Sequence, residues 1–433
     1  MREMKDSGVA WLGDIDSRFD IKAIGNLFTI KKDIIGREPD QVLSITQRGI
    51  KIKDTTSNEG QNAASYAHYQ IVNVGDFAMN HMDLLTGWVD ISQYEGVTSP
   101  DYRVFTLTDN TQIPEYFLRV FQMYYSNRVF YAFGQGAANL GRWRLPRENF
   151  VKIAIPCPPV ELQRKIVDEI AAKVSKVDAL IANQQAQIEK LKQYKQSLIT
   201  EVVTKGLNPD APMKDSGVEW IGVINSRYSL QRIKHFICEY KAGPFGSALI
   251  TGNLLSEGGI LVYTPEHIAN QSTDNPKNLF LPESRRSEME QFFVSQGNII
   301  FPIVGSLGRA MYITADMPEG IINQRLAKFR IDESRVDKDY FLYLFAKSDF
   351  YKPFLDVHSR GAIIVNLTKE IVYNMPFIIP PVDEQREIVS YLDEKCTYID
   401  KLITLKTQKV EKLTQYKKSL IYEYVTGKKE VSL

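Results

Sequence analysis

Arginine and lysine residues, several of them beside glycines, are the side chains of this sequence best suited to binding a charged ligand. A glycine lets the backbone approach closely, and an arginine beside it can contact a phosphate or read guanine through two hydrogen bonds. The candidates in the first half of the chain are Lys31, Lys32, Arg37, Arg142, Arg144 and Arg147. Those in the second half are Arg285, Arg286, Arg309, Gln324, Arg325 and Arg360. Any one of them alone is more often a solvated surface residue, so each is a weak signal individually.

No motif of a common catalytic or cofactor site accompanies these residues. The sequence has no Walker A or HExxH pattern, and Gly134, Gly136 and Gly141 lack the spacing of a dinucleotide-binding loop. The tetrapeptide of amino-methyltransferases is also absent, because Asn208-Pro209-Asp210 lacks the second proline and the aromatic residue. The five histidines are scattered without metal-ligand spacing. The sequence therefore favours binding or scaffolding over catalysis.

The composition is that of an ordinary globular chain. Its 433 residues leave room for about two to four domains. A net charge of +1, from 53 Lys+Arg against 52 Asp+Glu, excludes a bulk polycation but not a local basic surface. No apolar run reaches about 18 residues, and the N-terminus has no apolar signal segment. The three cysteines lie far apart without a CxxC pair, so we expect no disulfide framework or cysteine-based zinc site, and a reducing cytoplasm as the location.

The strongest signal is an internal repeat. MKDSGVAWLG at 4–13 returns as MKDSGVEWIG at 213–222, an offset of 209 positions. PPVELQRKIV at 158–167 returns as PPVDEQREIV at 380–389, and YKQSLITEVVT at 194–204 returns as YKKSLIYEYVT at 416–426, both with an offset of 222. The segments between these landmarks show little resemblance to each other. Two unlike modules on a repeated scaffold predict one operation performed on two targets, although a duplication whose loops have drifted would give the same pattern.

Each copy ends in a stretch that predicts a long helix. From Glu161 to about Thr204 there is no proline or glycine, and apolar residues recur at steps of three and four, as they do in the second copy. Pro158-Pro159 and Pro380-Pro381 precede the two stretches, and Gly206 and Gly427 follow them. About 40 helical residues would span about 60 Å.

An apolar stripe of this length cannot be buried alone, and its simplest partner is the other copy. The two helices would then form an intramolecular coiled coil. The short connection Gly206-Leu207-Asn208-Pro209 permits an antiparallel pair with the modules at opposite ends. Such a rod would be a ruler, because its length fixes the distance between the modules. At about 60 Å it exceeds one turn of duplex DNA, which measures about 34 Å. The alternative is that each helix packs on its own module.

Both modules are mixed α/β by pattern. The stretches 69–80 and 293–301 each run from a β-like segment through a Gly-Asp or Gly-Asn turn into a second β-like segment, which predicts hairpins. Helix-like stretches are expected from Tyr116 to Tyr125 and from Tyr340 to Phe345.

Together these segments resemble the specificity (S) subunit of type I restriction-modification systems over essentially the whole chain. The resemblance rests on SGVxWxG in both copies, on PPVELQRKIV and PPVDEQREIV, and on YKQSLI and YKKSLI. In the second module it also rests on Gly243-Pro244-Phe245-Gly246-Ser247, on the stretch 297–308, and on Asn323-Gln324. Leu162 departs from the family pattern, in which a glutamate precedes the glutamine as Glu384 does in the second copy. The first module has no counterpart of the Gly-Pro-Phe-Gly-Ser motif.

The resemblance implies an α+β fold: two mixed α/β target recognition domains joined by two long helices in an antiparallel intramolecular coiled coil, with a pseudo-twofold repeat. The boundaries would be 1–157 for the first recognition domain, 158–206 for the central helical region, 207–378 for a linker and the second recognition domain, and 379–433 for the C-terminal helical region. It also implies a subunit without catalytic activity. Each domain would read one half of an asymmetric bipartite DNA site, and the helices would set the unread spacer.

The partners implied by the resemblance are double-stranded DNA, two modification (M) subunits and restriction (R) subunits, with no membrane. S-adenosylmethionine is expected on the modification subunit, and ATP and Mg on the restriction subunit, with no cofactor or metal on this chain. Ser247 joins the basic residues as a DNA-binding candidate because it lies in the family motif.

Two other classes of function stay open. A DNA methyltransferase or nuclease fragment would have activity of its own, and the missing methyltransferase motifs argue against it. A coiled-coil structural scaffold that does not bind DNA would fail to bind a modification-type partner.

Overall fold

A computed structural model describes residues 3–56, 62–136, 143–244, 249, 252, 254–304, 308–359 and 367–431 of the chain. The chain divides into two compact units, of which the first comprises Met1–Gln185 and Thr407–Leu433, and the second Ala186–Lys406. Each unit therefore holds one module together with part of each long helix, and the first unit holds both ends of the chain. No helix in the described ranges is long and apolar enough to cross a membrane.

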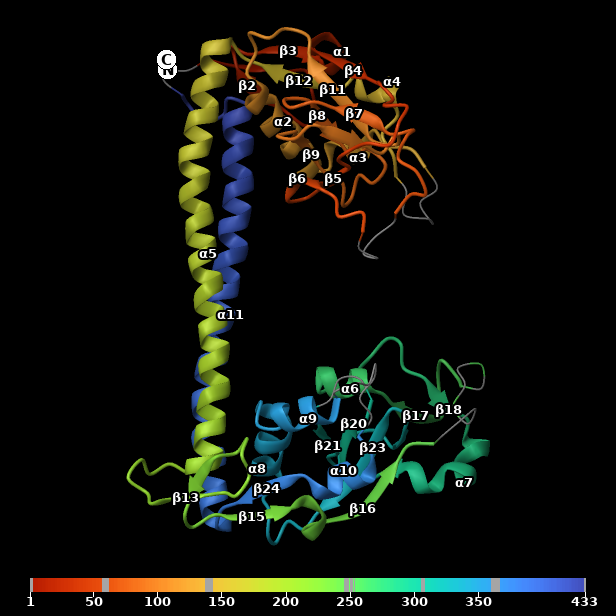
Figure 1. Cartoon of the computed structure of the whole chain (residues 1–433), viewed down its shortest axis with the longest axis vertical. Helices are drawn as coiled ribbons and strands as arrows, with labels where there is room; N and C mark the ends of the chain where they lie inside the picture. The colour runs from red at the N-terminus through yellow and green to blue at the C-terminus, as the bar shows by residue number, and fades with distance from the viewer. Residues whose placement is uncertain are drawn as a thin grey trace. The chain divides into compact units, whose positions relative to one another are not determined.

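The first module is built on a four-stranded antiparallel sheet in the order β4-β11-β8-β9. Its strands are β4 (Phe28–Lys31), β11 (Arg103–Leu107), β8 (Phe77–Met79) and β9 (Val89–Ile91). Helix α2 (Pro114–Ser126) lies against the sheet (Figure 1), and its buried side chains join the sheet's apolar residues in one core. The centre of this core is a cluster of aromatic rings: Phe28, Phe77, Phe105, Phe117 and Phe121. Each buried ring contributes about 1.5–3 kcal/mol, so the cluster holds the helix to the sheet.

The second module repeats this strand order as β16-β23-β20-β21. The strands are β16 (Ile237–Ala242), β23 (Leu326–Ile331), β20 (Ile299–Pro302) and β21 (Met311–Tyr312). Helix α8 (Lys338–Leu342) and the π-helical turn Tyr343–Lys347 take the position that α2 has in the first module. A further sheet is added, with the order β18 (Phe280–Leu281), β17 (Ile260–Tyr263), β22 (Gly320–Ile322) and β19 (Phe293–Val294). The two modules thus share a sheet that their sequences do not reveal.

The repeated opening motif forms the same hairpin twice. β1 (Met4–Asp6) pairs with β2 (Asp14–Asp16), and β13 (Met213–Asp215) pairs with β14 (Val223–Asn225). A second repeated pair follows, in which β3 (Asp20–Ala23) lies beside β12 (Ala154–Cys157) and β15 (Ser229–Arg232) beside β24 (Pro376–Ile379).

Short elements complete each unit. In the first unit they are β5 (Leu43–Thr46) with β6 (Gly49–Ile52), β7 (Gln70–Val72) with β10 (Gly96–Thr98), and the helices α1 (Ile24–Leu27), α3 (Val129–Ala132) and α4 (Arg147–Phe150). In the second they are α6 (Pro265–Asn270), α7 (Arg286–Met289), α9 (Lys352–Ser359) and α10 (Lys369–Asn374), with 3-10 turns at Ile233–His235, Glu283–Arg285 and Glu290–Phe292.

Two long helices, α5 (Val160–Lys205) and α11 (Val382–Val425), lie side by side and antiparallel within each unit (Figure 1). In the first unit the Lys417 ammonium lies 2.7 Å from the Asp178 carboxylate, and in the second unit Lys195 lies 2.7 Å from Asp400. The residue number on α11 falls as that on α5 rises, so the helices run in opposite directions. The two ion pairs are counterparts at the repeat offset of 222.

Each long helix serves both modules. Helix α5 begins in the core of the first module with Leu162 and Ile166, and it ends in the core of the second with Ile199 and Val203. Helix α11 does the reverse, because Ile388 belongs to the second core and Leu420 to the first. Each helix thus packs on its own module at its start, as the alternative expected, and on the other module at its end.

A buried glutamine ties the start of each helix to its module. The side chain of Gln163 accepts from the Ile113 N–H at 3.0 Å and donates to Gln112 at 2.7 Å, just where α2 begins. Gln385 accepts from the Asp337 N–H at 2.8 Å and donates to the Arg335 carbonyl at 3.0 Å, just where α8 begins. The repeated glutamine thus fixes the same junction twice.

A buried tyrosine ties each module to the end of the other copy's helix. The Tyr116 hydroxyl donates to the Val425 carbonyl at 2.9 Å, and the Tyr340 hydroxyl to the Val203 carbonyl at 3.2 Å. These carbonyls lie in the last helical turn, where no intrahelical donor remains. Gly206 (φ +83°) and Gly427 (φ +68°) follow in the left-handed conformation that ends a helix, which confirms both predicted stop signals.

Leu162 and Glu384 differ because their neighbours differ. The Glu384 carboxylate accepts a 2.7 Å hydrogen bond from the Tyr228 hydroxyl. At the matching place in the first copy stands Phe19, which has no hydroxyl and lies with Leu162 in the same core.

The predicted hairpins at 69–80 and 293–301 are wrong. β7 pairs with β10, whereas β8 after the turn pairs with β11 and β9. β19 pairs with β22, whereas β20 pairs with β21 and β23. The turns do exist, but the strands on either side of each turn enter different sheets. The helices expected from Tyr116 and Tyr340 are confirmed.

Candidate nucleic-acid interface

Three of the sequence motifs in the second module meet at one edge of its main sheet. β16 and β20 end at this edge, and β23 begins there, because Ala242 lies opposite Ala327 and Pro302 opposite Leu326. The Gly243 N–H donates to the Leu326 carbonyl at 2.8 Å. We call this region the module 2 edge; it consists of Gly243, Ile303, Arg309, Asn323, Gln324 and Arg325.

Close backbone contacts shape the module 2 edge. A Cβ on Gly243 would lie 2.6 Å from the carbonyl carbon of Asn323, so only glycine fits there. The Asn323 side chain accepts from the Arg325 N–H at 3.0 Å, and the Arg325 carbonyl accepts from the Ile303 N–H at 2.9 Å. The side chains of Arg309, Gln324 and Arg325 are exposed. Arginine and glutamine are donors suited to phosphates and base edges.

The first module has the corresponding edge. Lys31 ends β4 opposite Val104, and Met79 ends β8 opposite Arg103. The Leu145 N–H donates to the His81 carbonyl at 2.9 Å, and this bond brings the stretch 143–147 to the edge. Its counterpart in the second module is the 2.8 Å bond from the Leu367 N–H to the Ile303 carbonyl. We call this region the module 1 edge; it consists of Lys31, Lys32, His81, Arg103, Arg144 and Arg147.

A buried arginine supports the module 1 edge. The Arg103 guanidinium donates through Nη2 to the Leu145 carbonyl at 2.9 Å and lies 4.5 Å above the Phe150 ring. Its Nη1 is buried and has no hydrogen-bond partner in the described part of the chain. Burial lowers the pKa of Arg103 to about 10, so the group stays charged at neutral pH. Arg103 therefore holds the segment that carries Arg144 and Arg147.

Two other ionisable side chains of the module 1 edge, His81 and Lys31, do not offer a free positive charge. Burial lowers the pKa of His81 to about 3, helped by the positive charges of Arg103 and Arg144, so the imidazole is neutral at physiological pH. The Lys31 ammonium is held 2.6 Å from the buried Asp76 carboxylate. Lys32, Arg144 and Arg147 are exposed.

The remaining candidates lie elsewhere. Arg37 lines a separate cavity of about 690 Å³ in the first unit, together with polar side chains that include Gln41, Asn73, Gln93 and Tyr94. Such amide, guanidinium and hydroxyl groups can also contact base edges. Arg142, Ser247 and Arg360 lie outside the described residues.

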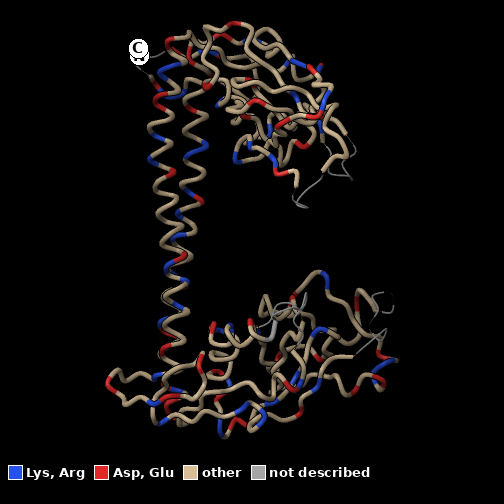
Figure 2. The backbone as a smooth tube through the Cα atoms, viewed as in Figure 1, with Lys and Arg blue, Asp and Glu red and all other residues tan. Residues whose placement is uncertain are grey.

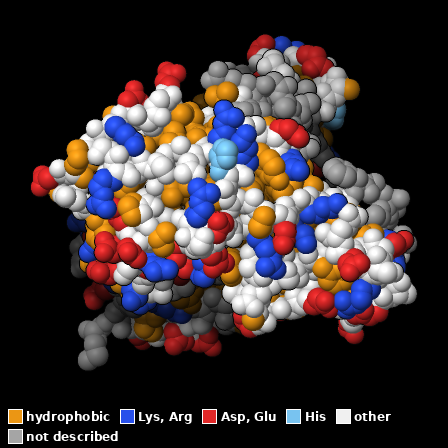
Figure 3. Space-filling model, turned by 90° about the horizontal axis from the view of Figure 1, so that it is seen from below, with side chains coloured by type: hydrophobic (Ala, Val, Ile, Leu, Met, Phe, Trp, Pro, Cys, Tyr) orange, Lys and Arg blue, Asp and Glu red, His pale blue; other side chains and the backbone are white. Residues whose placement is uncertain are grey.

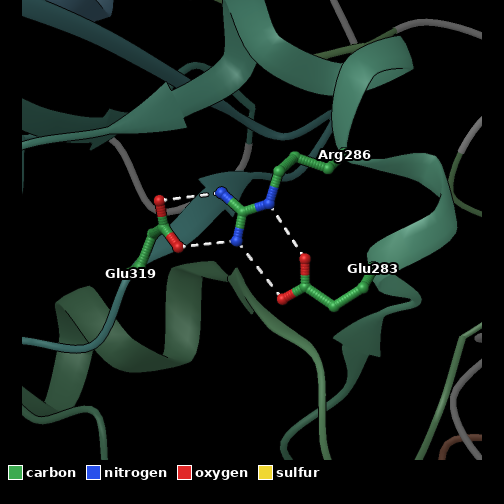
Figure 4. Close-up of polar contacts among 3 residues, drawn as sticks. All are labelled: Glu283, Arg286 and Glu319. Carbon is green, nitrogen blue, oxygen red and sulfur yellow. Dashed lines mark hydrogen bonds and ion pairs between the residues drawn. The ribbon is translucent and has the colours of Figure 1, made fainter.

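Arg285 and Arg286 are held in ion pairs away from the module 2 edge. Arg285 lies 2.7 Å from Glu288. Arg286 lies between two glutamates (Figure 4), with Nη2 at 2.8 Å from Glu319 and Nε at 2.9 Å from Glu283. The hydrogen bonds that Arg286 donates to Glu319 and then to Glu283 raise the pKa of Arg286 further above its usual range. Both carboxylates would have to be displaced before this guanidinium could contact a phosphate.

Sequence reasoning missed His81 and Arg103. Neither lies in a basic cluster or beside a glycine, and Arg103 stands at the start of an apolar strand. The signal in the sequence that could have revealed Arg103 is a charged residue at the start of an apolar strand, where charged residues are rare. Lys and Arg positions are interspersed with Asp and Glu positions along the backbone of both modules (Figure 2), so the edges are defined by geometry rather than by bulk charge. Within the described ranges, no group of three or more His, Cys, Asp or Glu side chains could hold a metal ion.

Comparisons with known proteins support the resemblance to the type I specificity subunits. Residues 237–415 match the model of the type I restriction modification DNA specificity domain. The putative type I restriction enzyme MjaX specificity subunit of Methanocaldococcus jannaschii is 23% identical over 417 residues, which cover 94% of this chain and 91% of that protein. The chain is similar to type I specificity subunits over nearly its whole length. The resemblance inferred from the sequence is thereby confirmed.

Two further likenesses were found, one in sequence and one in fold. The type I restriction enzyme MjaVIII specificity subunit of the same organism is 25% identical over 287 residues; the match covers 65% of this chain and spans 63% of the length of that specificity subunit. A chain from a solved structure, described as "Structural basis underlying complex assembly and conformational transition of the type I R-M system", has a TM-score of 0.68 at 14% identity and covers 95% of this chain and 98% of that chain. At this identity the likeness supports the mixed α/β fold alone.

Proposed function

We propose that the chain is a non-catalytic DNA sequence-specificity subunit of a type I restriction-modification enzyme. Each module would read one half of an asymmetric bipartite site through its sheet edge. The observation that carries the proposal is the pair of edges: the same strand order presents Arg144 and Arg147 in one module, and Gln324 and Arg325 in the other. One framework with two different sets of donors suits two different DNA half-sites.

The paired helices would set the spacer between the half-sites. We infer one continuous antiparallel coiled coil with pseudo-twofold symmetry, supported by the repeat-related pairs Asp178–Lys417 and Asp400–Lys195. One heptad inserted into each helix, near Ala182 and Leu405, adds about 10 Å, or about three base pairs. We expect a longer spacer with unchanged half-sites; an unchanged spacer would mean that the helices are not the ruler.

The chain would act with partners that supply the chemistry. Two modification subunits would carry S-adenosylmethionine, and restriction subunits would carry ATP and Mg, with no cofactor on this chain. Phosphate contacts supply most of the non-specific affinity for DNA, and this chain is nearly neutral. We therefore expect tight DNA binding only when modification subunits complete a positively charged surface. Equal affinity of the lone chain and the complex at moderate salt would contradict this.

The test is co-expression of the chain with the modification subunit, followed by methylation mapping of the host genome. We expect methylated adenines at one bipartite sequence, and none with the modification subunit alone. Methylation or cleavage by the isolated chain would instead favour a methyltransferase or nuclease fragment. Failure to bind the modification subunit would favour a structural scaffold.

A further inference from the structure

A cavity in the second unit combines a cationic rim with an apolar floor. It has a volume of about 780 Å³. We call it the β15 pocket. The residues that line it include Trp220, Arg232, Lys234, His235, Arg335 and Phe354. On the face of the chain seen in Figure 3, basic side chains and a histidine lie among hydrophobic ones. The floor includes Trp220, whose ring lies 6.2 Å from that of Phe354.

The two arginines of the rim are positioned without being neutralised. Arg335 donates to the His235 carbonyl at 2.7 Å and to the Gln231 side chain at 2.8 Å, and Arg232 donates to the Asn374 side chain at 3.0 Å. All three acceptors are uncharged. No carboxylate lines the β15 pocket among the described residues. This contrasts with Arg286, which two glutamates neutralise, and it leaves a fixed positive charge that an anion can use.

The first copy lacks the rim of the β15 pocket. At the repeat offset of 209, Arg232, Lys234 and His235 correspond to Ala23, Gly25 and Asn26. A Cβ on Gly25 would lie only 3.0 Å from the Cβ of Val151, so a side chain at the position of Lys234 would crowd Val151 in the first copy. The aromatic floor is repeated, since Trp11 lies 5.2 Å from Phe133. The rim is thus a property of the second module and not of the scaffold.

We propose that the β15 pocket docks an acidic protein segment with an aromatic or aliphatic anchor residue, once per chain. Carboxylates would meet Arg232 and Lys234, and the anchor would pack on Trp220. The charge favours an anion, and the apolar floor distinguishes a peptide from duplex DNA, whose phosphates offer nothing to fill an apolar hollow. This inference does not depend on the DNA-reading function proposed above.

Fluorescence anisotropy on the full chain tests the β15 pocket with a labelled probe peptide, Gly-Glu-Glu-Phe-Glu-Glu-Gly. The variant Arg232→Ala, Lys234→Ala and His235→Asn removes the rim, and Lys214→Ala is the matched control, an exposed lysine of the same unit outside the pocket. We expect weak, salt-sensitive binding that falls at least about tenfold in the rim variant and is unchanged in the control. Peptides with Phe replaced by Ser, or Glu by Gln, should bind at least about tenfold more weakly.

Several results would overturn the proposal. They are no binding of the probe, equal binding by the rim variant, or equal binding of the peptide that lacks phenylalanine. Direct binding of labelled short duplex DNA that the rim variant loses and the control keeps would assign the β15 pocket to nucleic acid instead. Thermal unfolding of each variant checks that these exposed substitutions leave the fold intact.

Discussion

The two sheet edges have the same backbone and different side chains. In both modules the strand order is the same, and a leucine after a variable stretch donates to the end of the third strand: Leu145 to His81, and Leu367 to Ile303. The module 1 edge rests on the buried Arg103, whereas the module 2 edge rests on close backbone packing at Gly243. Backbone hydrogen bonds define the edge, and its side chains are therefore free to differ between targets.

The largest effect should come from removing the exposed arginines of one edge at a time. Arg144→Ala with Arg147→Ala should abolish recognition of one half-site, and Arg309→Ala with Arg325→Ala recognition of the other. Each arginine that contacts a base is worth about 1–3 kcal/mol of DNA binding. Filter binding of the complex to sites altered in one half measures this. If both variants lose the same half-site, the edges are not separate readers.

A methyl group on Gly243 should damage only the second module. Gly243→Ala pushes a Cβ into the Asn323 backbone, and such overpacking costs about 1–3 kcal/mol of unfolding free energy. Gly252→Ala is the control, because a Cβ there meets no atom of the described residues within 4 Å. Hydrogen exchange at β20 and β8 compares the two sheets. Equal loss of protection in β8 would contradict the separation.

Acid should weaken the first module through His81. Its folded pKa of about 3 lies below the ordinary value of 6.5, so the unfolded chain takes up a proton that the folded chain excludes. The contribution of neutral His81 to the free energy of unfolding should therefore be fully present above pH 6.5. It should be lost as the pH drops from 6.5 towards 3, by at most about 1.4 kcal/mol per pH unit. Hydrogen exchange at β8 across this range measures it, and His81→Asn should flatten the response. An unchanged response in that variant would assign the acid sensitivity to other groups.

The smallest effect should come from the interhelical ion pairs. Lys417→Ala in the first unit and Lys195→Ala in the second each remove a partly exposed pair worth about 0–1 kcal/mol, less at high salt. Denaturant titration should give two similar, small losses of unfolding free energy. A large loss in only one variant would show that the repeat-related pairs are not equivalent.

The repeated parts of the fold could be predicted from sequence, and the modules could not. The helix starts, the glycine stops and the repeat follow from local rules that Pro159 and Gly206 illustrate. The hairpin predictions failed because a turn such as Gly75-Asp76 fixes chain reversal but not which strands pair. Pairing depends on contacts between distant residues, which a single sequence does not reveal.

The candidate site was predictable only as scattered residues. The glycine-flanked motifs of the second module, Gly243 and Asn323-Gln324, do meet at one edge. The ion pairs Arg286–Glu319 and Lys31–Asp76 could not be foreseen, because the partners lie 33 and 45 positions apart. Arg103 was missed because its role comes from burial rather than from neighbours in the sequence.

Replacing one module tests the central claim most directly. The segment 16–155 would be exchanged for the corresponding module of another specificity subunit, leaving both long helices intact. Methylation mapping with the modification subunit should then report a new first half-site, with the second half-site and the spacer unchanged. A folded chimera that changes both half-sites, or neither, would contradict an account in which two independent edges read the DNA.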